Sequence, residues 1–189
     1  MDEQLRTVMD RLRKESGASD EFQRIADIRD PETLADVLTA AGRPLWAREL
    51  AAFRLGTAGD RRAFEALVLL LNHRDPARGA AAATALARLA DPRTARAAAA
   101  LATNELRAAY ALHPVRLLVE LRAPESVPAL ITALERRLTP HDPHHRLALA
   151  CVEGLGELGD PRARPVLRAA GAAHPGLAEA AGRALSRLP

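Results

Sequence analysis

A leucine-anchored motif that recurs five times constrains the fold of this 189-residue chain more than any other feature. In each copy a leucine is followed three positions later by a second small or apolar residue, then by Asp or a small residue, and often by Pro. A fixed period of about 30 residues is typical of stacked supersecondary units, each of which buries the apolar side of its neighbour. The anchoring leucines are 31, 32, 37 and 30 residues apart and are Leu55, Leu86, Leu118, Leu155 and Leu185.

Apolar residues between the anchors follow the spacing of a helix. After Asp60, for example, they are Phe64, Leu67, Val68 and Leu71. Such a stripe lies along one side of a helix with 3.6 residues per turn. A second helix ends at each anchor, and the small residues that precede the anchor allow neighbouring helices to approach closely. Every unit is therefore expected to be an antiparallel helix pair.

These patterns predict an all-α fold, a right-handed α-α superhelix of about five helix pairs. Residues 29–189 are expected to form the repeat array. Residues 1–28 lie outside the period and are expected to form an N-terminal helical cap or arm, since Leu5, Val8 and Leu12 share one side of a helix. The repeat units are expected at about 30–59, 60–90, 91–122, 123–159 and 160–189.

Three segments resemble the HEAT-like repeats first described in phycobilin lyases. They are RELAAFRLG at 48–56, VPAL at 127–130 and GLGELGDPR at 154–162. The resemblance concerns the fold and extends over about residues 30–189. It implies a solenoid that serves as a non-catalytic scaffold or adaptor for a protein partner, because this repeat family functions mainly in that way.

Positive charge is concentrated in the middle of the chain. The net charge of the whole chain is +3, whereas residues 42–123 carry 13 basic and 7 acidic side chains, a net charge of +6. This distribution suits an acidic protein surface or segment, and it also suits a phosphate backbone. Nucleic-acid binding through a basic concave face, similar to that of helical-repeat DNA glycosylases, is therefore one alternative. A bilin-lyase-like chaperone, implied by the resemblance alone, is another.

Partner-binding residues are expected on the second helices, which line the concave groove of such arrays. Trp46 lies beside arginines, a composition typical of binding hot spots, although it could equally anchor the packing between repeats. Arg48, Arg78 and Arg116 lie in the second helices of three consecutive units. We expect their exposed guanidinium groups to form a ladder along the groove.

Two irregular segments add further candidate residues. Pro114 falls where the second helix of the third unit should be continuous, so that helix must kink or begin anew. Tyr110 and His113 lie at this bend and are expected to contact a partner, unless the bend only adjusts curvature. The longest unit contains a loop at 139–146, in which His144 and His145 are expected to form part of an exposed interaction surface.

No residue pattern indicates catalysis, a metal site or a cofactor. Pro143 argues against a helix that would bring His141 and His145 to a shared metal, and zinc ligands usually converge from two elements. Cys151 lies among small helix residues and is expected to be a buried packing residue. No long apolar run and no signal-peptide pattern occur, so the chain is expected to be cytoplasmic and not to enter a membrane.

Overall fold

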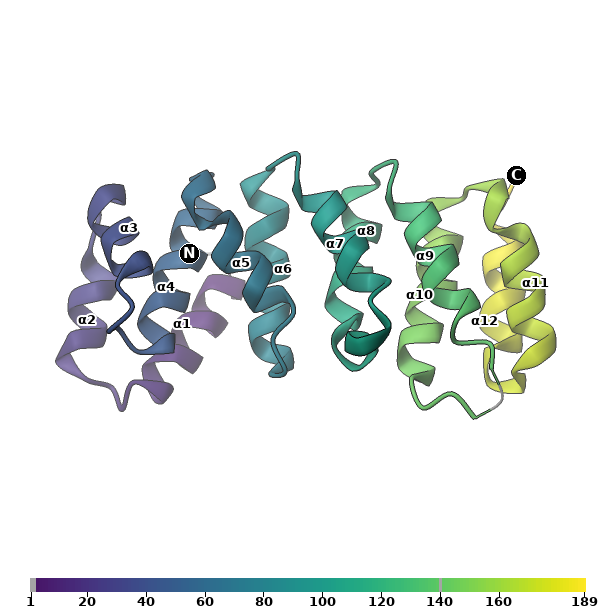
Figure 1. Ribbon diagram of the computed structural model, residues 1–189, viewed down its shortest axis with the longest axis horizontal. Helices are drawn as coiled ribbons and strands as arrows, with labels where there is room; N and C mark the ends of the chain where they lie inside the picture. Colours follow the sequence, from purple (N-terminus) through teal and green to yellow (C-terminus); the bar gives the residue numbers. More distant parts are fainter. Residues whose placement is uncertain (1–2, 140) are drawn as a thin grey trace. The chain divides into compact units, whose positions relative to one another are not determined.

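The computed structural model describes residues 3–139 and 141–189. Within these residues the chain forms twelve α-helices and three short 3₁₀ turns, and no strand (Figure 1). The predicted all-α helical-repeat fold is confirmed. The chain divides between Thr94 and Ala95 into two compact parts, the N-terminal unit and the C-terminal unit.

The N-terminal unit contains two helices ahead of the repeats and two helix pairs. Within the pairs, α3 packs on α4 and α5 packs on α6, and the second helices α4 and α6 also pack on each other. The elements are α1 (Glu3–Glu15), α2 (Asp20–Asp27), α3 (Pro31–Thr39), α4 (Leu45–Thr57), η1 (Arg61–Ala63), α5 (Phe64–Leu71) and α6 (Pro76–Leu89).

The C-terminal unit continues the same alternation. Its helix α9 packs on α10 and α11 packs on α12, while the second helix α10 also lies against α8 on one side and α12 on the other. The elements are α7 (Thr94–Ala102), η2 (Glu105–Tyr110), α8 (Leu112–Leu121), α9 (Ser126–Glu135), α10 (His145–Leu158), η3 (Pro161–Ala163), α11 (Arg164–Ala173) and α12 (Pro175–Ser186).

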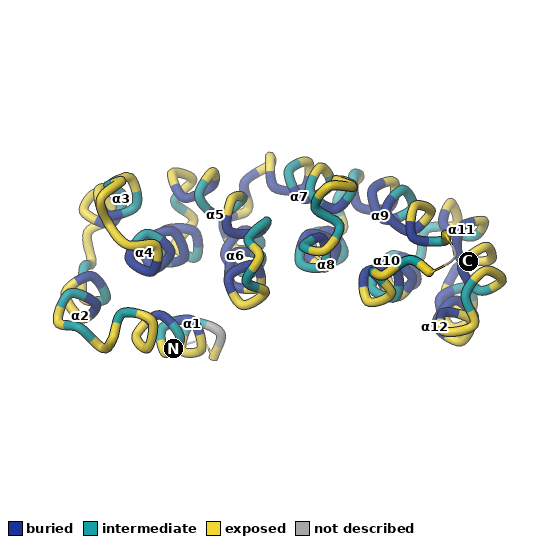
Figure 2. Tube along the Cα trace, turned by 60° about the horizontal axis from the view of Figure 1, so that its bottom comes forward, coloured by how far each residue is buried: buried dark blue, intermediate teal, exposed yellow. Residues whose placement is uncertain are grey.

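Figure 2 shows the layers within each unit. In the N-terminal unit α3 and α5 form one layer, α4 and α6 form the next, and α1 and α2 lie on the other side of α4 and α6. In the C-terminal unit α7, α9 and α11 form one layer and α8, α10 and α12 form the other. The core lies between the layers, because the anchoring leucines of α4, α6, α8 and α10 and the apolar stripes of the first helices are buried there.

Small residues on the second helices allow the close packing that the sequence predicts. A Cβ atom added to Gly156 in α10 would lie 2.8 Å from the backbone Cα of Ala184 in α12. Gly56 in α4 approaches Leu67 and Ala85 in the same manner, with 2.5 Å between the added Cβ and the Leu67 side chain. Such distances are shorter than any ordinary contact between carbon atoms, so glycine is required at position 156, where the neighbour is backbone, whereas at position 56 the Leu67 side chain would have to move.

Three unit boundaries share an Asp-x-Arg turn. In each turn the Asp carboxylate accepts hydrogen bonds from the backbone N–H and the guanidinium group of the arginine two residues later. The turns begin at Asp60, Asp91 and Asp160. Hydrogen bonding by the arginine lowers the pKa of all three carboxyl groups, and that of Asp91 falls to about 2. The repeated Asp therefore fixes the start of the next helix pair, as an N-cap does.

The irregular third helix pair has a simple geometry. The chain forms the 3₁₀ turn η2 and then begins α8 at Leu112, so Pro114 is the third residue of a new helix. A proline in the first helical turn removes no intrahelical hydrogen bond, since those amide groups have no partner within the helix. The second helix of this pair begins anew at the bend, one of the two outcomes that the sequence allows.

Candidate partner-binding surfaces

The second helices present a distinct set of side chains on the side away from the first helices. The anchoring leucines of α4, α6, α8 and α10 are buried in the core, and that of α12 is half-buried. The residues two positions before and two positions after each anchor point to the opposite side of the helix, since one residue turns the helix by about 100°. These residues are the flanking positions of each second helix. They allow the same face to be compared between repeats.

In the C-terminal unit all flanking positions are charged and exposed. Glu153 and Glu157 of α10 line two adjacent hollows of about 290 and 340 Å³. Because α10 packs between α8 and α12, its two carboxylates lie between the charged rows of those helices. The flanking residues are Arg116 and Glu120 on α8, Glu153 and Glu157 on α10, and Arg183 and Arg187 on α12. We call this surface the charged face of the C-terminal unit. It carries both positive and negative side chains, and the negative ones include the two glutamates at its centre.

In the N-terminal unit the corresponding face is covered by α1. The positions equivalent to Arg116 and Glu153 hold Phe53 on α4 and Thr84 on α6. Phe53 and Thr84 line a cleft of about 390 Å³ to which α1 contributes Val8, and Phe53 itself is buried. The apolar side of α1 is therefore packed on the second helices, because Val8 and Leu12 are buried as well.

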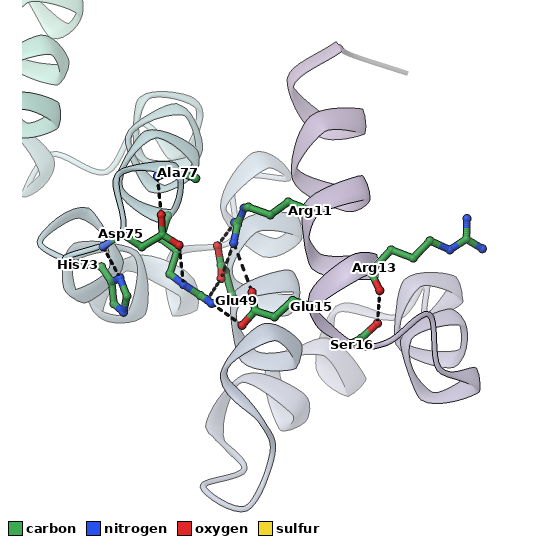
Figure 3. A network of polar contacts seen from close by, with 9 residues as sticks. Arg11, Arg13, Glu15, Ser16, Glu49, His73, Asp75 and Ala77 are labelled. Atoms are coloured by element: carbon green, nitrogen blue, oxygen red, sulfur yellow. Dashed lines mark hydrogen bonds and ion pairs between the residues drawn. The ribbon is translucent and has the colours of Figure 1, made fainter.

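A network of charged side chains fixes α1 on this face (Figure 3). Glu49 of α4 is only 2% exposed and accepts hydrogen bonds from Arg11 of α1 and from Arg78 of α6. Arg78 is 7% exposed, donates to Glu15 of α1, and has its Nε atom 3.4 Å from a carboxylate oxygen of Asp75. A buried carboxylate requires such partners, since an unpaired charge in the interior is strongly unfavourable.

Two predicted groove residues are therefore placed differently from the expectation. Trp46 is 8% exposed, and its ring lies 6.0 Å from that of Phe22 in α2, so the prediction that it is exposed is wrong. Arg78 cannot belong to a ladder of free guanidinium groups, because Glu15 and Glu49 bind it within the unit. Arg48 is half-buried in the first turn of α4. The physical reason is the same for Trp46 and Arg78, since α1 and α2 occupy the face that the sequence leaves open.

The three candidates around the bend are nearer to solvent. Arg116 is exposed, while Tyr110 and His113 are half-buried. The guanidinium group of Arg107 lies 4.5 Å from the centre of the Tyr110 ring, a cation–π contact. Burial and the nearby charge of Arg116 lower the pKa of His113, which favours its neutral form. Only Arg116 of these three belongs to the charged face of the C-terminal unit.

In the loop that precedes α10, Asp142 contacts both His144 and Arg137. Its carboxylate accepts a hydrogen bond from the backbone N–H of His144, with 2.8 Å between nitrogen and oxygen, and lies 3.2 Å from Arg137 Nη1. His144 is half-buried, and His145 is exposed at the first position of α10. Across the described ranges 3–139 and 141–189, no group of three His, Cys, Asp or Glu side chains could hold a metal ion.

Cys151 is fully buried in α10, and burial raises the pKa of its thiol to about 12. A thiol with such a pKa is neutral at pH 7 and is a poor nucleophile. The sequence thus placed Cys151 correctly as a packing residue. It did not identify Glu49, although a carboxylate next to the apolar residues Leu50 to Phe53 was the signal that a charged partner covers it.

Comparison with known families supports the repeat assignment. The family model of the PBS lyase HEAT-like repeat matches residues 147–170, which contain most of α10, the turn η3 and the first part of α11. The match joins the second helix of one pair to the first helix of the next, and it confirms the HEAT-like resemblance at this segment. No curated protein matches the chain. Within the described residues, every helix is too short or too polar to cross a membrane.

Proposed function

We propose that this chain is a non-catalytic scaffold that binds a protein partner on the charged face of the C-terminal unit. The observation that supports this most strongly is the position of α1, which lies on the same face of the N-terminal unit. One polypeptide helix already binds the second helices of this repeat, so the surface has the shape that a helical segment needs. The corresponding face of the C-terminal unit is exposed and lined by charged side chains.

The charge pattern suggests the chemistry of the partner. Glu153 and Glu157 form the acidic centre of the face, and Arg116 and Arg183 lie on the helices at either side. A segment with basic residues along its middle and acidic residues at its sides is complementary to this pattern. The arginines alone would suit the acidic partner that the composition suggests. The three flanking glutamates disfavour nucleic acid, because they would repel the phosphate backbone.

Site-specific photo-crosslinking tests this proposal. A benzophenone amino acid replaces Glu153 in one variant and Arg168 in a matched control, since Arg168 is also exposed but lies on the first helix α11. Both variants are irradiated in an extract of the cells that naturally produce the protein. The proposal predicts a discrete protein adduct at position 153 that is absent or much weaker at position 168.

Charge-reversal variants test which arginines the partner contacts. Replacing Arg116 and Arg183 by Glu should abolish formation of the adduct, whereas replacing Arg96 and Arg168 on the first helices changes the net charge equally and should leave it intact. An adduct that contains RNA or DNA, with binding that weakens steeply between about 50 and 200 mM salt, would support the nucleic-acid alternative instead. Equal adducts at positions 153 and 168 would contradict the proposed surface.

A further inference from the structure

The helix α1 is held by repeats that are distant from it in sequence. Its residue Arg11 pairs with Glu49 and its residue Glu15 pairs with Arg78, over separations of 38 and 63 residues. Val8 and Leu12 bury the apolar side of the same helix. The contacts that position α1 are thus made with α4, and with α6 through the pair of Glu15 and Arg78, and they resemble those of a bound peptide helix more than those of a repeat.

The surface beneath α1 selects its occupant by charge as well as by shape. Glu49 is buried and pairs with Arg78 and with Arg11 of α1, and Arg78 pairs with Glu49 and Asp75 of the repeats and with Glu15 of α1. A suitable helix presents an arginine, a carboxylate four residues later, and apolar residues three positions before and one position after the arginine. In α1 these are Arg11, Glu15, Val8 and Leu12, and Arg11 Nη1 lies 3.7 Å from Glu15. The helix that fulfils these requirements is present in every copy of the chain.

The connection between α1 and α2 is short and conformationally unfavourable. Gly17 and Ala18 both have left-handed backbone conformations, with φ values of 66° and 53°. Glycine adopts this conformation readily, whereas alanine does so at a cost because of its Cβ atom. A short hinge under strain favours exchange of the segment that it connects, since opening the hinge relieves the strain and the same contacts are remade with another copy.

We infer that the surface beneath α1 is a helix-binding site that α1 of a second copy can fill, so that two copies exchange α1 and form a closed dimer. The ion pairs of Arg11 and Glu15 are then made with Glu49 and Arg78 of the other chain. A short linker gives the attached helix an effective concentration of about 1 mM, so exchange in the wild type is expected as the chain concentration approaches that value. This inference concerns the N-terminal unit and does not depend on the proposed function.

Shortening the hinge provides the first test. Deleting Gly17 and Ala18 shortens the connection by up to about 7 Å, so α1 should no longer fold back onto its own chain. Light scattering coupled to gel filtration should show a mass twice that of one chain at micromolar concentration. The matched variant Ala18→Gly keeps the length, relieves the strained residue and should remain monomeric. A monomeric deletion variant would overturn the inference.

The dimer must also use the assigned contacts. Adding Arg11→Glu to the deletion variant places a negative charge against Glu49, and the doubled mass should disappear while the far-UV circular dichroism remains helical. A dimer that persists in this double variant forms through another surface, and that result would also overturn the inference.

A second test uses the full-length chain and does not depend on the folding of the deletion variant. Thr7 of α1 and Thr84 of α6 both line the cleft beside α1. Chains with Thr7→Cys and isotope-labelled chains with Thr84→Cys are mixed at about 1 mM, diluted and treated with a bismaleimide. Mass spectrometry should identify a 7–84 crosslink between labelled and unlabelled chains. The control pairs Thr7→Cys with Thr39→Cys on α3, which should give none. Absence of the 7–84 crosslink between chains would contradict the exchange.

Discussion

The N-terminal and C-terminal units use the same face of their second helices in different ways. In the N-terminal unit Phe53 and Thr84 occupy flanking positions beside α1, where Phe53 is buried and Thr84 is half-buried. In the C-terminal unit the equivalent positions hold Arg116, Glu153 and Arg183, all of which are exposed. Both units are built from pairs of packed helices. The difference lies in the flanking positions that precede the anchors, which hold Phe53 and Thr84 beside α1 and only charged residues in the C-terminal unit, whereas Arg88 of α6 is charged and exposed in the N-terminal unit as well.

The contrast shows how a repeat protein can divide its surface between stability and recognition. Apolar flanking residues gain free energy when a helix removes them from water, about 25 cal/mol per Å². Charged flanking residues remain hydrated and contribute little to folding, yet they distinguish between partners by complementarity. The covered face therefore stabilises the N-terminal unit, and we propose that the open face of the C-terminal unit binds the partner.

The largest expected difference in stability is between substitutions of two glutamates, Glu49 beneath α1 and Glu153 on the open face of the C-terminal unit. Glu49→Ala removes the carboxylate shared by Arg11 and Arg78 and should lower the free energy of unfolding by about 3 kcal/mol, as for other buried ion pairs. Glu153→Ala on the open face should change it by less than about 0.5 kcal/mol. Urea unfolding followed by circular dichroism measures both. Similar effects of the two substitutions would show that the two faces do not differ as described.

A pair of glycines tests the close packing of the open unit. Gly156→Ala places a methyl group 2.8 Å from the Ala184 backbone and should cost about 1–3 kcal/mol. Gly182→Ala on α12 meets no atom within 4 Å and should stabilise the chain by up to about 1 kcal/mol, because alanine favours helix more than glycine does. The midpoint temperature of thermal unfolding should fall for Gly156→Ala and rise for Gly182→Ala. A tolerated Gly156→Ala would mean that α10 and α12 can separate without loss.

The units should also differ in their response to mild acid. Burial holds the pKa of His113 below its ordinary value of 6.5, so the unfolded chain binds more protons than the folded chain in that range. The stability that neutral His113 contributes is therefore present above pH 6.5 and is lost as the pH falls below it. The carboxyl groups of Asp60 and Asp91 in the N-terminal unit have lowered pKa values and lose their contribution only below about pH 4.

The variant His113→Gln isolates this effect. Its stability should fall less than that of the wild type between pH 7.5 and 5, measured by urea unfolding at each pH. Parallel curves for the two proteins would show that His113 does not titrate differently in the folded and unfolded chains. A loss of stability that begins only below about pH 4 in the wild type would have the same meaning.

The helix pairs could be predicted from the sequence because their signals are local. The stripe around Phe64 and Leu67 lies within α5 and the small residues around Gly56 lie within α4, and burial in each helix follows from helical spacing alone. The covering of the N-terminal face could not be predicted in the same way. Arg78 resembles an exposed groove residue, and its partner Glu15 is 63 positions away. Only the tertiary structure shows which charged residues are already paired.

Thiol accessibility at two equivalent positions tests the central comparison most directly. Single cysteines replace Thr84 and Glu153, and the rate of maleimide labelling is measured, while the native Cys151 reacts slowly because it is buried. The cysteine at position 153 should react as an exposed thiol does. The cysteine at position 84, which is half-buried in the cleft beside α1, should react more slowly than the one at position 153 and should react faster when Arg11→Glu releases α1. Equal rates at the two positions, or no change on adding Arg11→Glu, would contradict the account.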